Sequence, residues 1–144
     1  MNAAFPAPLL IAKGRAICRR TPVYRPLSCF ENIDWRRVFR SAGQGHALGV
    51  VVSACSSTRT IEHCIHTIFA AHHAAGWHTS LWIVVVGDSW QDDTAARARK
   101  VLGAFGEVLT VRARSLRTLY RIGVGAIEMH FKDKSPPAVA LTAV

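Results

Sequence analysis

Polar and reactive side chains follow directly after apolar runs at three places in this sequence. The runs are ALGVVV, LWIVVV and EVLTV, and the six side chains that follow them are Ser53, Cys55, Ser57, Asp88, Arg112 and Arg114. Serine hydroxyls can donate to a phosphate or a sugar, a carboxylate is a strong directional acceptor, and guanidinium groups hold anions bidentately. Side chains of these types would suit a small anionic ligand if the fold brings them together.

Each of these residues also has a local explanation. The serines can cap a helix that starts near Thr58. Asp88 can satisfy backbone donors in its own turn. Arg112 and Arg114 belong to a cluster continued by Arg117 and Arg121, which can equally be a solvated loop and helix face. Both explanations stay open at this point.

A second group of residues has the chemistry of metal ligands. Its members are Glu62, His63, Cys64, His66, His72, His73 and His78. On a helix His63 and His66 form an i,i+3 pair that can chelate, but Cys64 and His72 fall on the apolar face. The spacing fits no standard zinc motif, so we expect no metal here.

The cysteines indicate little redox chemistry. Cys18, Cys29, Cys55 and Cys64 contain no C-x-x-C pair and are too few for a disulfide scaffold in a chain of 144 residues. Cys55 precedes a predicted helix, and a helix N-terminus can lower a thiol pKa, so a nucleophilic Cys55 remains an alternative.

Four apolar, β-branched runs predict strands. They are residues 48–54, 81–86, 107–111 and 138–142. Helical spacing predicts helices between them, over 58–75, over 94–105 with Asp92 or Asp93 as the cap, and over 120–131, entered through Gly123 and Gly125.

Strands that alternate with helices predict an α/β fold, a Rossmann-like parallel sheet with flanking helices. Ligands of such sheets bind outside the carboxyl ends of the strands. The polarity of the sheet therefore places Ser53 to Ser57, Gly87 to Gln91, Arg112 to Arg114 and the last residues of the chain on one functional edge.

The first 45 residues differ from the rest. They contain four of the six prolines, eight basic and two acidic residues. Only 31–40 looks helical, with Trp35 and Phe39 on one apolar face. We therefore divide the chain into a basic Pro/Arg-rich extension, 1–45, and a domain, 46–144, and expect 1–30 to lack regular structure.

Composition narrows the class of protein. Half of the residues are hydrophobic, the net charge is +9, and no apolar run approaches the length of a membrane span. Charge patches without interleaved aromatic residues do not favour nucleic-acid binding. The leader lacks the flanks of a secretory signal, so we expect a cytoplasmic protein.

The order of these segments resembles family 2 glycosyltransferases of the GT-A fold. The segments are VVVSACSSTRTIEHCI, IVVVGDSWQDDTAARARKV, RIGVGAIEMH and AVALTAV. The resemblance covers residues 48–144 and places Ser53 and Ala54 on a Pro-Ala pair and Gly87 and Asp88 on paired aspartates. It places Gly123, Gly125 and Ala126 near a glycine segment.

The resemblance implies the nucleotide-binding half of a partial GT-A fold. Asp88 would accept from N3–H of uracil, and the ligand would be a nucleotide-diphosphate sugar of the uridine type. The family also holds Mg²⁺ or Mn²⁺ through Asp-x-Asp, but this chain has Thr142-Ala143-Val144 there. Ser56-Ser57 likewise replaces Asn-Glu, and Gly87 replaces an aspartate. We therefore expect no metal site, and a chain inactive by itself.

Other functions compete with this glycosyltransferase hypothesis. The chain can be a truncated, non-catalytic remnant, or a basic interaction module whose Arg-rich leader binds an acidic partner. If 138–142 ends the sheet, its exposed edge invites self-association.

Overall fold

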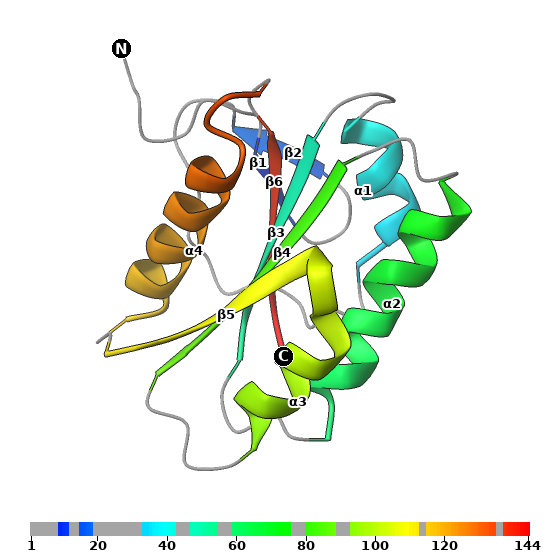
Figure 1. Cartoon of the computed structure of the whole chain (residues 1–144). Coiled ribbons are helices and arrows are strands. Elements are labelled where there is room, and N and C mark those ends of the chain that lie inside the picture. Colours follow the sequence, from blue (N-terminus) through cyan, green and yellow to red (C-terminus); the bar gives the residue numbers. More distant parts are fainter. Residues whose placement is uncertain are drawn as a thin grey trace.

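The computed structural model describes residues 9–11, 15–18, 33–42, 47–54, 59–75, 80–88, 93–112, 115–134 and 137–144. Within these residues, six strands form one sheet in the order β2-β1-β6-β3-β4-β5. The fold is α/β and Rossmann-like, with helices on both faces of the sheet, as the sequence predicted (Figure 1).

Parallel strands form the centre of the sheet. They are β3 (Ala47–Ser53), β4 (Ser80–Asp88), β5 (Gly106–Val111) and β6 (Ala138–Ala143). β3 pairs in parallel with both β4 and β6, and β4 pairs in parallel with β5. Each strand therefore ends at the same side of the molecule, and the predicted strand positions are confirmed to within about two residues at either end.

Helices α1 (Trp35–Ala42), α2 (Ile61–Ala74) and α3 (Thr94–Leu102) lie on one face of the sheet, and α4 (Leu116–His130) lies on the other (Figure 1). We call these the α1–α3 face and the α4 face. The alternation of side chains along each strand supplies both faces with apolar residues, which explains why the strand sequences are continuously hydrophobic.

The α1–α3 face is filled by aliphatic side chains. Val50, Val52 and Ile83 of the sheet pack against Ile65 and Ile68 of α2, and all five are fully buried. Burying a side chain of this size contributes about 1.5–3 kcal/mol relative to leaving it in water. This layer is the larger of the two cores.

The α4 face depends on glycines. A Cβ atom on Gly49 of β3 would lie 2.4 Å from Cγ2 of Ile127, and one on Gly123 would lie 2.4 Å from Cγ1 of Val51. Such distances leave no room for a side chain. Gly49 and Gly123 therefore let the backbone of α4 approach the sheet, and they are packing residues.

The structure corrects two predictions about helix α4. It begins at Leu116 rather than near residue 120, and Ser115 caps it through an N–H of Thr118 at 3.2 Å. Gly123 and Gly125 lie inside the helix and not at its entry. The arginine-rich stretch before residue 120 did not indicate a helix in the sequence. Leu119 and Tyr120, near the start of this helix, are nevertheless buried.

The prediction that residues 1–30 lack regular structure is wrong for two segments. β1 (Leu9–Ile11) pairs in parallel with β6, and β2 (Arg15–Cys18) pairs antiparallel with β1. Short strands of this kind take their stability from the sheet they join, so their own proline-rich surroundings did not reveal them.

The predicted exposed edge at 138–142 is also wrong. β6 lies between β1 and β3, and Ala138 to Thr142 are buried. Because β6 is paired on both sides, the prediction of self-association through that strand is wrong as well. Among the described residues, no helix is long and apolar enough to cross a membrane.

Candidate functional site

The parallel strands end together at the lower side of the molecule in Figure 1, which we call the carboxyl edge. There Ser53 of β3 pairs with Val86 of β4 and Ala143 of β6. The pairing continues beyond the strands, because Ala54 donates its N–H to the carbonyl of Val86 at 3.0 Å and Val144 donates to that of Ser53 at 2.9 Å. Backbone hydrogen bonds therefore connect the ends of β3, β4 and β6, and we call these connected strand ends the platform.

Three of the six predicted site residues fall on this platform or beside it. Ser53 is 5% exposed at the end of β3. Asp88 ends β4 opposite Val111 of β5, and Arg112 follows as an exposed residue. For Asp88 the structure describes the backbone position. The other three, Cys55, Ser57 and Arg114, lie outside the described residues.

Helices α2, α3 and α4 each begin after a strand has ended at the carboxyl edge. Their N-termini carry unpaired backbone N–H groups and the positive end of the helix dipole, both of which favour anions. Thr60 and Asp93, the N-cap residues of α2 and α3, make no side-chain cap hydrogen bond, whereas Ser115 caps α4.

Asp93 occupies the predicted cap position but not the predicted role. Its Oδ2 accepts from Nε of Arg97 at 2.9 Å, and Nη1 of Arg97 donates to Oε2 of Glu62 at 3.1 Å. The two carboxylates raise the pKa of Arg97, with the hydrogen bond to Asp93 the larger cause. Arg97 thus joins the beginnings of α2 and α3 by pairing with both acids.

Tyr120 fixes α4 to the carboxyl edge. Its side chain is fully buried, and its hydroxyl donates to the carbonyl of Thr142 at 2.9 Å. Burial raises the pKa of Tyr120, so the phenol stays neutral and keeps donating. The neighbouring Thr142 hydroxyl is buried and has no hydrogen-bond partner among the described residues.

The end of β6 does not fit a divalent cation of the kind that the glycosyltransferase family uses. Mg²⁺ and Mn²⁺ prefer carboxylate oxygens, but Thr142, Ala143 and Val144 offer a single hydroxyl, which is buried. Among the described residues, no group of three or more His, Cys, Asp or Glu side chains can hold a metal. We derive no step through a metal ion.

The histidine and cysteine group of α2 is divided by the helix. Cys64 and His72 are buried, as predicted, and the ring of His72 lies 5.4 Å from that of Phe39. Burial raises the pKa of the Cys64 thiol to about 12, which keeps it protonated and unreactive. His63 and His66 face solvent. Packing therefore accounts for the buried members.

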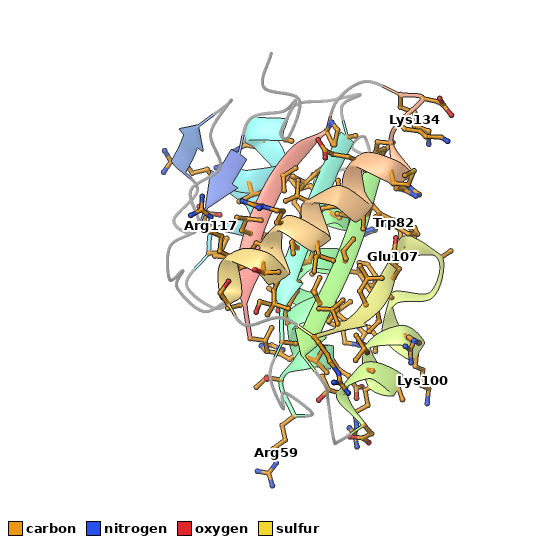
Figure 2. All side chains as sticks on the ribbon, turned by 90° about the vertical axis from the view of Figure 1, so that its left-hand side faces the viewer. Arg59, Trp82, Lys100, Glu107, Arg117 and Lys134 are labelled. Carbon is orange, nitrogen blue, oxygen red and sulfur yellow. The ribbon has the colours of Figure 1, made fainter. Side chains whose placement is uncertain are left out.

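Sequence reasoning missed Arg59 as a candidate. It precedes α2 at the carboxyl edge, is exposed, and projects away from the body of the protein (Figure 2). In the described part of the chain, neither Arg59 nor Arg112 forms an ion pair with a carboxylate. The helix start that follows Arg59 was the available signal, because a cation beside a helix N-terminus favours an anion.

No protein-family model matches this chain, and no curated protein is significantly similar to it.

Proposed function

We propose that the carboxyl edge binds a nucleoside diphosphate, of the uridine type, and that the chain corresponds to the nucleotide-binding part of a GT-A glycosyltransferase. One observation carries the proposal. The strand register brings Ser53, Asp88 and Arg112 to the same edge of a parallel sheet, where α2, α3 and α4 begin. Such edges are the usual ligand sites of open α/β sheets.

Within this proposal the diphosphate lies against the helix starts. Backbone N–H groups at the beginning of α2, together with Arg59 and Arg112, supply donors and positive charge to the phosphate oxygens. Neither guanidinium is neutralised by a described carboxylate, in contrast to Arg97, which is held by Asp93 and Glu62. Arg59 and Arg112 are therefore the better candidates for an anion.

The base and sugar then extend along the ends of β3 and β4. Asp88 is the acidic residue at these strand ends, and a carboxylate there can accept from N3–H of uracil. Ser53 ends the neighbouring strand opposite Val86, two residues before Asp88, and provides a hydroxyl for the ribose. Cytosine lacks an N3–H, so the carboxylate would favour uracil over cytosine.

Glycosyl transfer needs more than this binding. The bond from the sugar to the diphosphate breaks as the acceptor attacks, and negative charge develops on the departing phosphate oxygen. In families with Asp-x-Asp a cation stabilises that charge, whereas here Arg59 and Arg112 are the described groups available for it. We propose nucleotide binding as the property of this chain, and sugar transfer as an activity that also needs the acceptor-binding half of the family's fold.

Titration calorimetry with uridine diphosphate tests the proposal. We expect Asp88→Ala to weaken binding by about 1–3 kcal/mol, the cost of leaving a buried polar partner unpaired. Arg112→Gln should weaken it as well, because it removes a charge from the site. Arg99→Gln, on the exposed side of the last turn of α3, removes the same charge at the end of that helix that lies away from the carboxyl edge, and is the matched control.

Two outcomes would contradict the proposal. Absence of binding at millimolar uridine diphosphate would leave a non-catalytic remnant as the better description. Equal losses from Arg112→Gln and Arg99→Gln would show only general attraction of an anion to a basic protein. A large gain in affinity with Mn²⁺ would overturn our conclusion that the end of β6 does not fit a cation.

A further inference from the structure

A groove with a basic rim lies between helices α1 and α2, away from the carboxyl edge. One hollow of about 290 Å³ is lined by Arg36, Arg40, Ala71, Ala74 and Ala75. A second, of about 300 Å³, continues it past Arg36 and Ala71.

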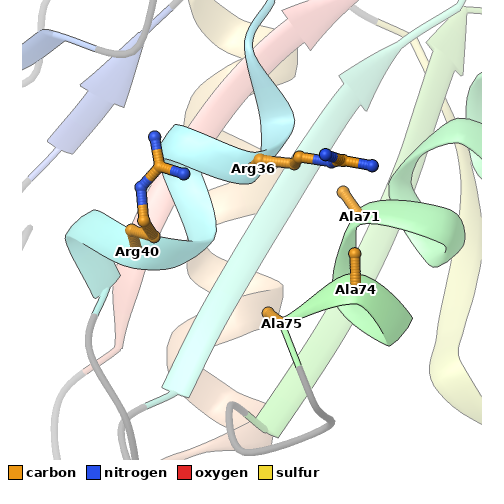
Figure 3. Close-up of a pocket in the computed structure, with 5 residues that line it drawn as sticks. All are labelled: Arg36, Arg40, Ala71, Ala74 and Ala75. Atoms are coloured by element: carbon orange, nitrogen blue, oxygen red, sulfur yellow. The ribbon is translucent and has the colours of Figure 1, made fainter.

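The two walls of the groove differ in chemistry. The α2 wall of the first hollow consists of alanines, and in the second hollow it also includes Thr67, whose hydroxyl already donates to the carbonyl of His63 at 2.8 Å. The α1 wall carries Arg36 and Arg40, one helical turn apart, and Figure 3 shows Arg36 extending toward Ala71 while Arg40 points away from the alanines. An occupant must therefore present apolar atoms to one side and negative charge to the other.

The arginines of α1 have no acidic partner within the described chain. Arg36, Arg37 and Arg40 are exposed, and the described ion pairs involve Arg97 instead. The nearby Asp34 already accepts from the backbone N–H of Arg37 at 3.2 Å. Asp34 lines the second hollow, but no described carboxylate forms an ion pair with the arginines of α1.

We propose that this groove binds an extended acidic peptide segment whose residues alternate between acidic and apolar side chains. Residues four apart in a helix are separated by a rise of about 6 Å, and alternate residues of an extended strand by about 6.6 Å. Carboxylates at alternate positions of the peptide can therefore meet Arg36 and Arg40 in turn. The intervening side chains point the opposite way, into the hollows over Ala71 and Ala74.

The end of α2 determines which side of the peptide faces it. The helix closes at Ala74, so its last carbonyl groups and the negative end of its dipole lie beside the hollow. Carboxylates are disfavoured there and favoured at the arginine wall. A nucleic-acid backbone would supply charge but no apolar side chains for the alanine wall, so the groove fits a peptide better.

Fluorescence anisotropy with a labelled peptide of repeated Asp-Leu units tests this on the full chain. We expect binding that weakens with salt, because Arg–carboxylate pairs at a surface are screened. Arg36→Glu/Arg40→Glu should weaken it roughly tenfold or more, equivalent to about 1.4 kcal/mol or more. The matched control, Arg117→Glu/Arg121→Glu, makes the same change at the same spacing on exposed positions of α4.

A second pair of variants tests the apolar wall without changing charge. Ala74→Phe fills the hollow and should weaken binding of the peptide. Ala96→Phe, on an exposed position of α3, should leave the affinity for the peptide unchanged. Thermal melts of every variant establish that it is folded. A peptide with the same residues in separate Asp and Leu blocks should bind more weakly, because it cannot address both walls in alternation.

Several results would overturn the proposal. They are no binding of the alternating peptide, equal affinity for the block peptide, equal losses from the α1 and α4 variants, or indifference to Ala74→Phe. Displacement of the peptide by a labelled DNA duplex that itself depends on Arg36 and Arg40 and binds more tightly would make the surface a nucleic-acid site. The readouts do not involve uridine diphosphate, so this proposal and the proposed function fail independently.

Discussion

The two faces of the sheet pack against their helices in different ways. On the α1–α3 face the core exists because side chains such as Ile65 and Ile68 are present and fill the space. On the α4 face close packing exists because side chains are absent at Gly49 and Gly123. Additions to the α4 face and deletions from the α1–α3 face should therefore be the damaging changes.

This contrast bears on the glycosyltransferase resemblance. The resemblance placed Gly123 and Gly125 near a glycine segment that opens a helix in that family. In the structure Gly123 faces Val51 of the sheet, so packing is sufficient to explain it. Gly125, two residues on, is exposed and would meet nothing within 4 Å. The glycines thus lend the resemblance little support, and its case depends on the strand ends.

Valine substitutions at the two glycines of α4 should give the largest difference. Gly123→Val places atoms on top of Val51 and should lower the free energy of unfolding by about 2–3 kcal/mol. Gly125→Val is the matched control, and it should change that energy by no more than about 0.5 kcal/mol, because valine is the better helix former. Urea unfolding at neutral pH measures both.

Similar losses at the two positions would contradict the comparison of the faces. They would show that the helix backbone, rather than its approach to the sheet, determines the effect. A compensating Val51→Ala in the Gly123→Val background should recover part of the lost stability, since it removes the side chain that the new valine meets.

Each face also buries one weakly acidic group, and this predicts how the protein responds to alkali. Burial raises the pKa of Cys64 on the α1–α3 face from 9.0 to about 12, and it raises that of Tyr120 on the α4 face above its ordinary 10.0. Above these ordinary values the unfolded chain releases protons that the folded chain retains. Stability should therefore be complete below pH 9 and fall as the pH rises toward 12.

The two contributions can be separated by pH. Between pH 9 and 10 the decline should come mainly from Cys64, at up to about 1.4 kcal/mol per pH unit, and Cys64→Ala should flatten it. Above pH 10 Tyr120 adds to the slope, and Tyr120→Phe should reduce that part. Urea unfolding at a series of pH values gives the slopes. A slope unchanged in Cys64→Ala would show that this thiol is accessible to water when the chain is folded.

Much of the sheet was predictable from local sequence. Runs such as LWIVVV are β-branched and continuous, which is typical of strands buried on both faces, and the helical segments between them require parallel pairing. The parallel arrangement predicted where the strands end, and it therefore also predicted that Ser53, Asp88 and Arg112 lie at one edge. These inferences depend on periodicity and connection rules, both of which are readable along the chain.

Features that depend on distant partners were not predictable. β1 is a strand because β6 is available to pair with it, and β6 is central for the same reason. The link between Asp93 and Arg97 was visible as an i,i+4 spacing, but Glu62 reaches the same arginine from another helix. No local sequence pattern predicts a contact between residues of two different helices. The α1–α2 groove likewise exists only once two helices are packed together.

A smaller effect should arise where the α4 face ends, at a stack of Trp82 on His130. The two rings lie 3.7 Å apart and 7° from parallel, and the Trp82 Nε1–H donates to Oε2 of Glu107 at 3.1 Å. Desolvation lowers the pKa of His130, the charge of Lys134 lowers it further, and the charge of Glu107 raises it. The folded protein therefore prefers the neutral imidazole, so this contribution to stability is present above pH 6.5 and is lost as the pH falls through the lower folded pKa.

Because His130 is exposed, the effect on stability should be slight, and the pKa itself, followed by NMR titration of the imidazole, is the better measurement. Glu107→Gln keeps an acceptor for Trp82 but removes the charge, so it should lower the pKa of His130 further, whereas Lys134→Met should raise it. Shifts of the same sign in both variants would mean that the ring stack, and not the two charges, sets the proton affinity of His130.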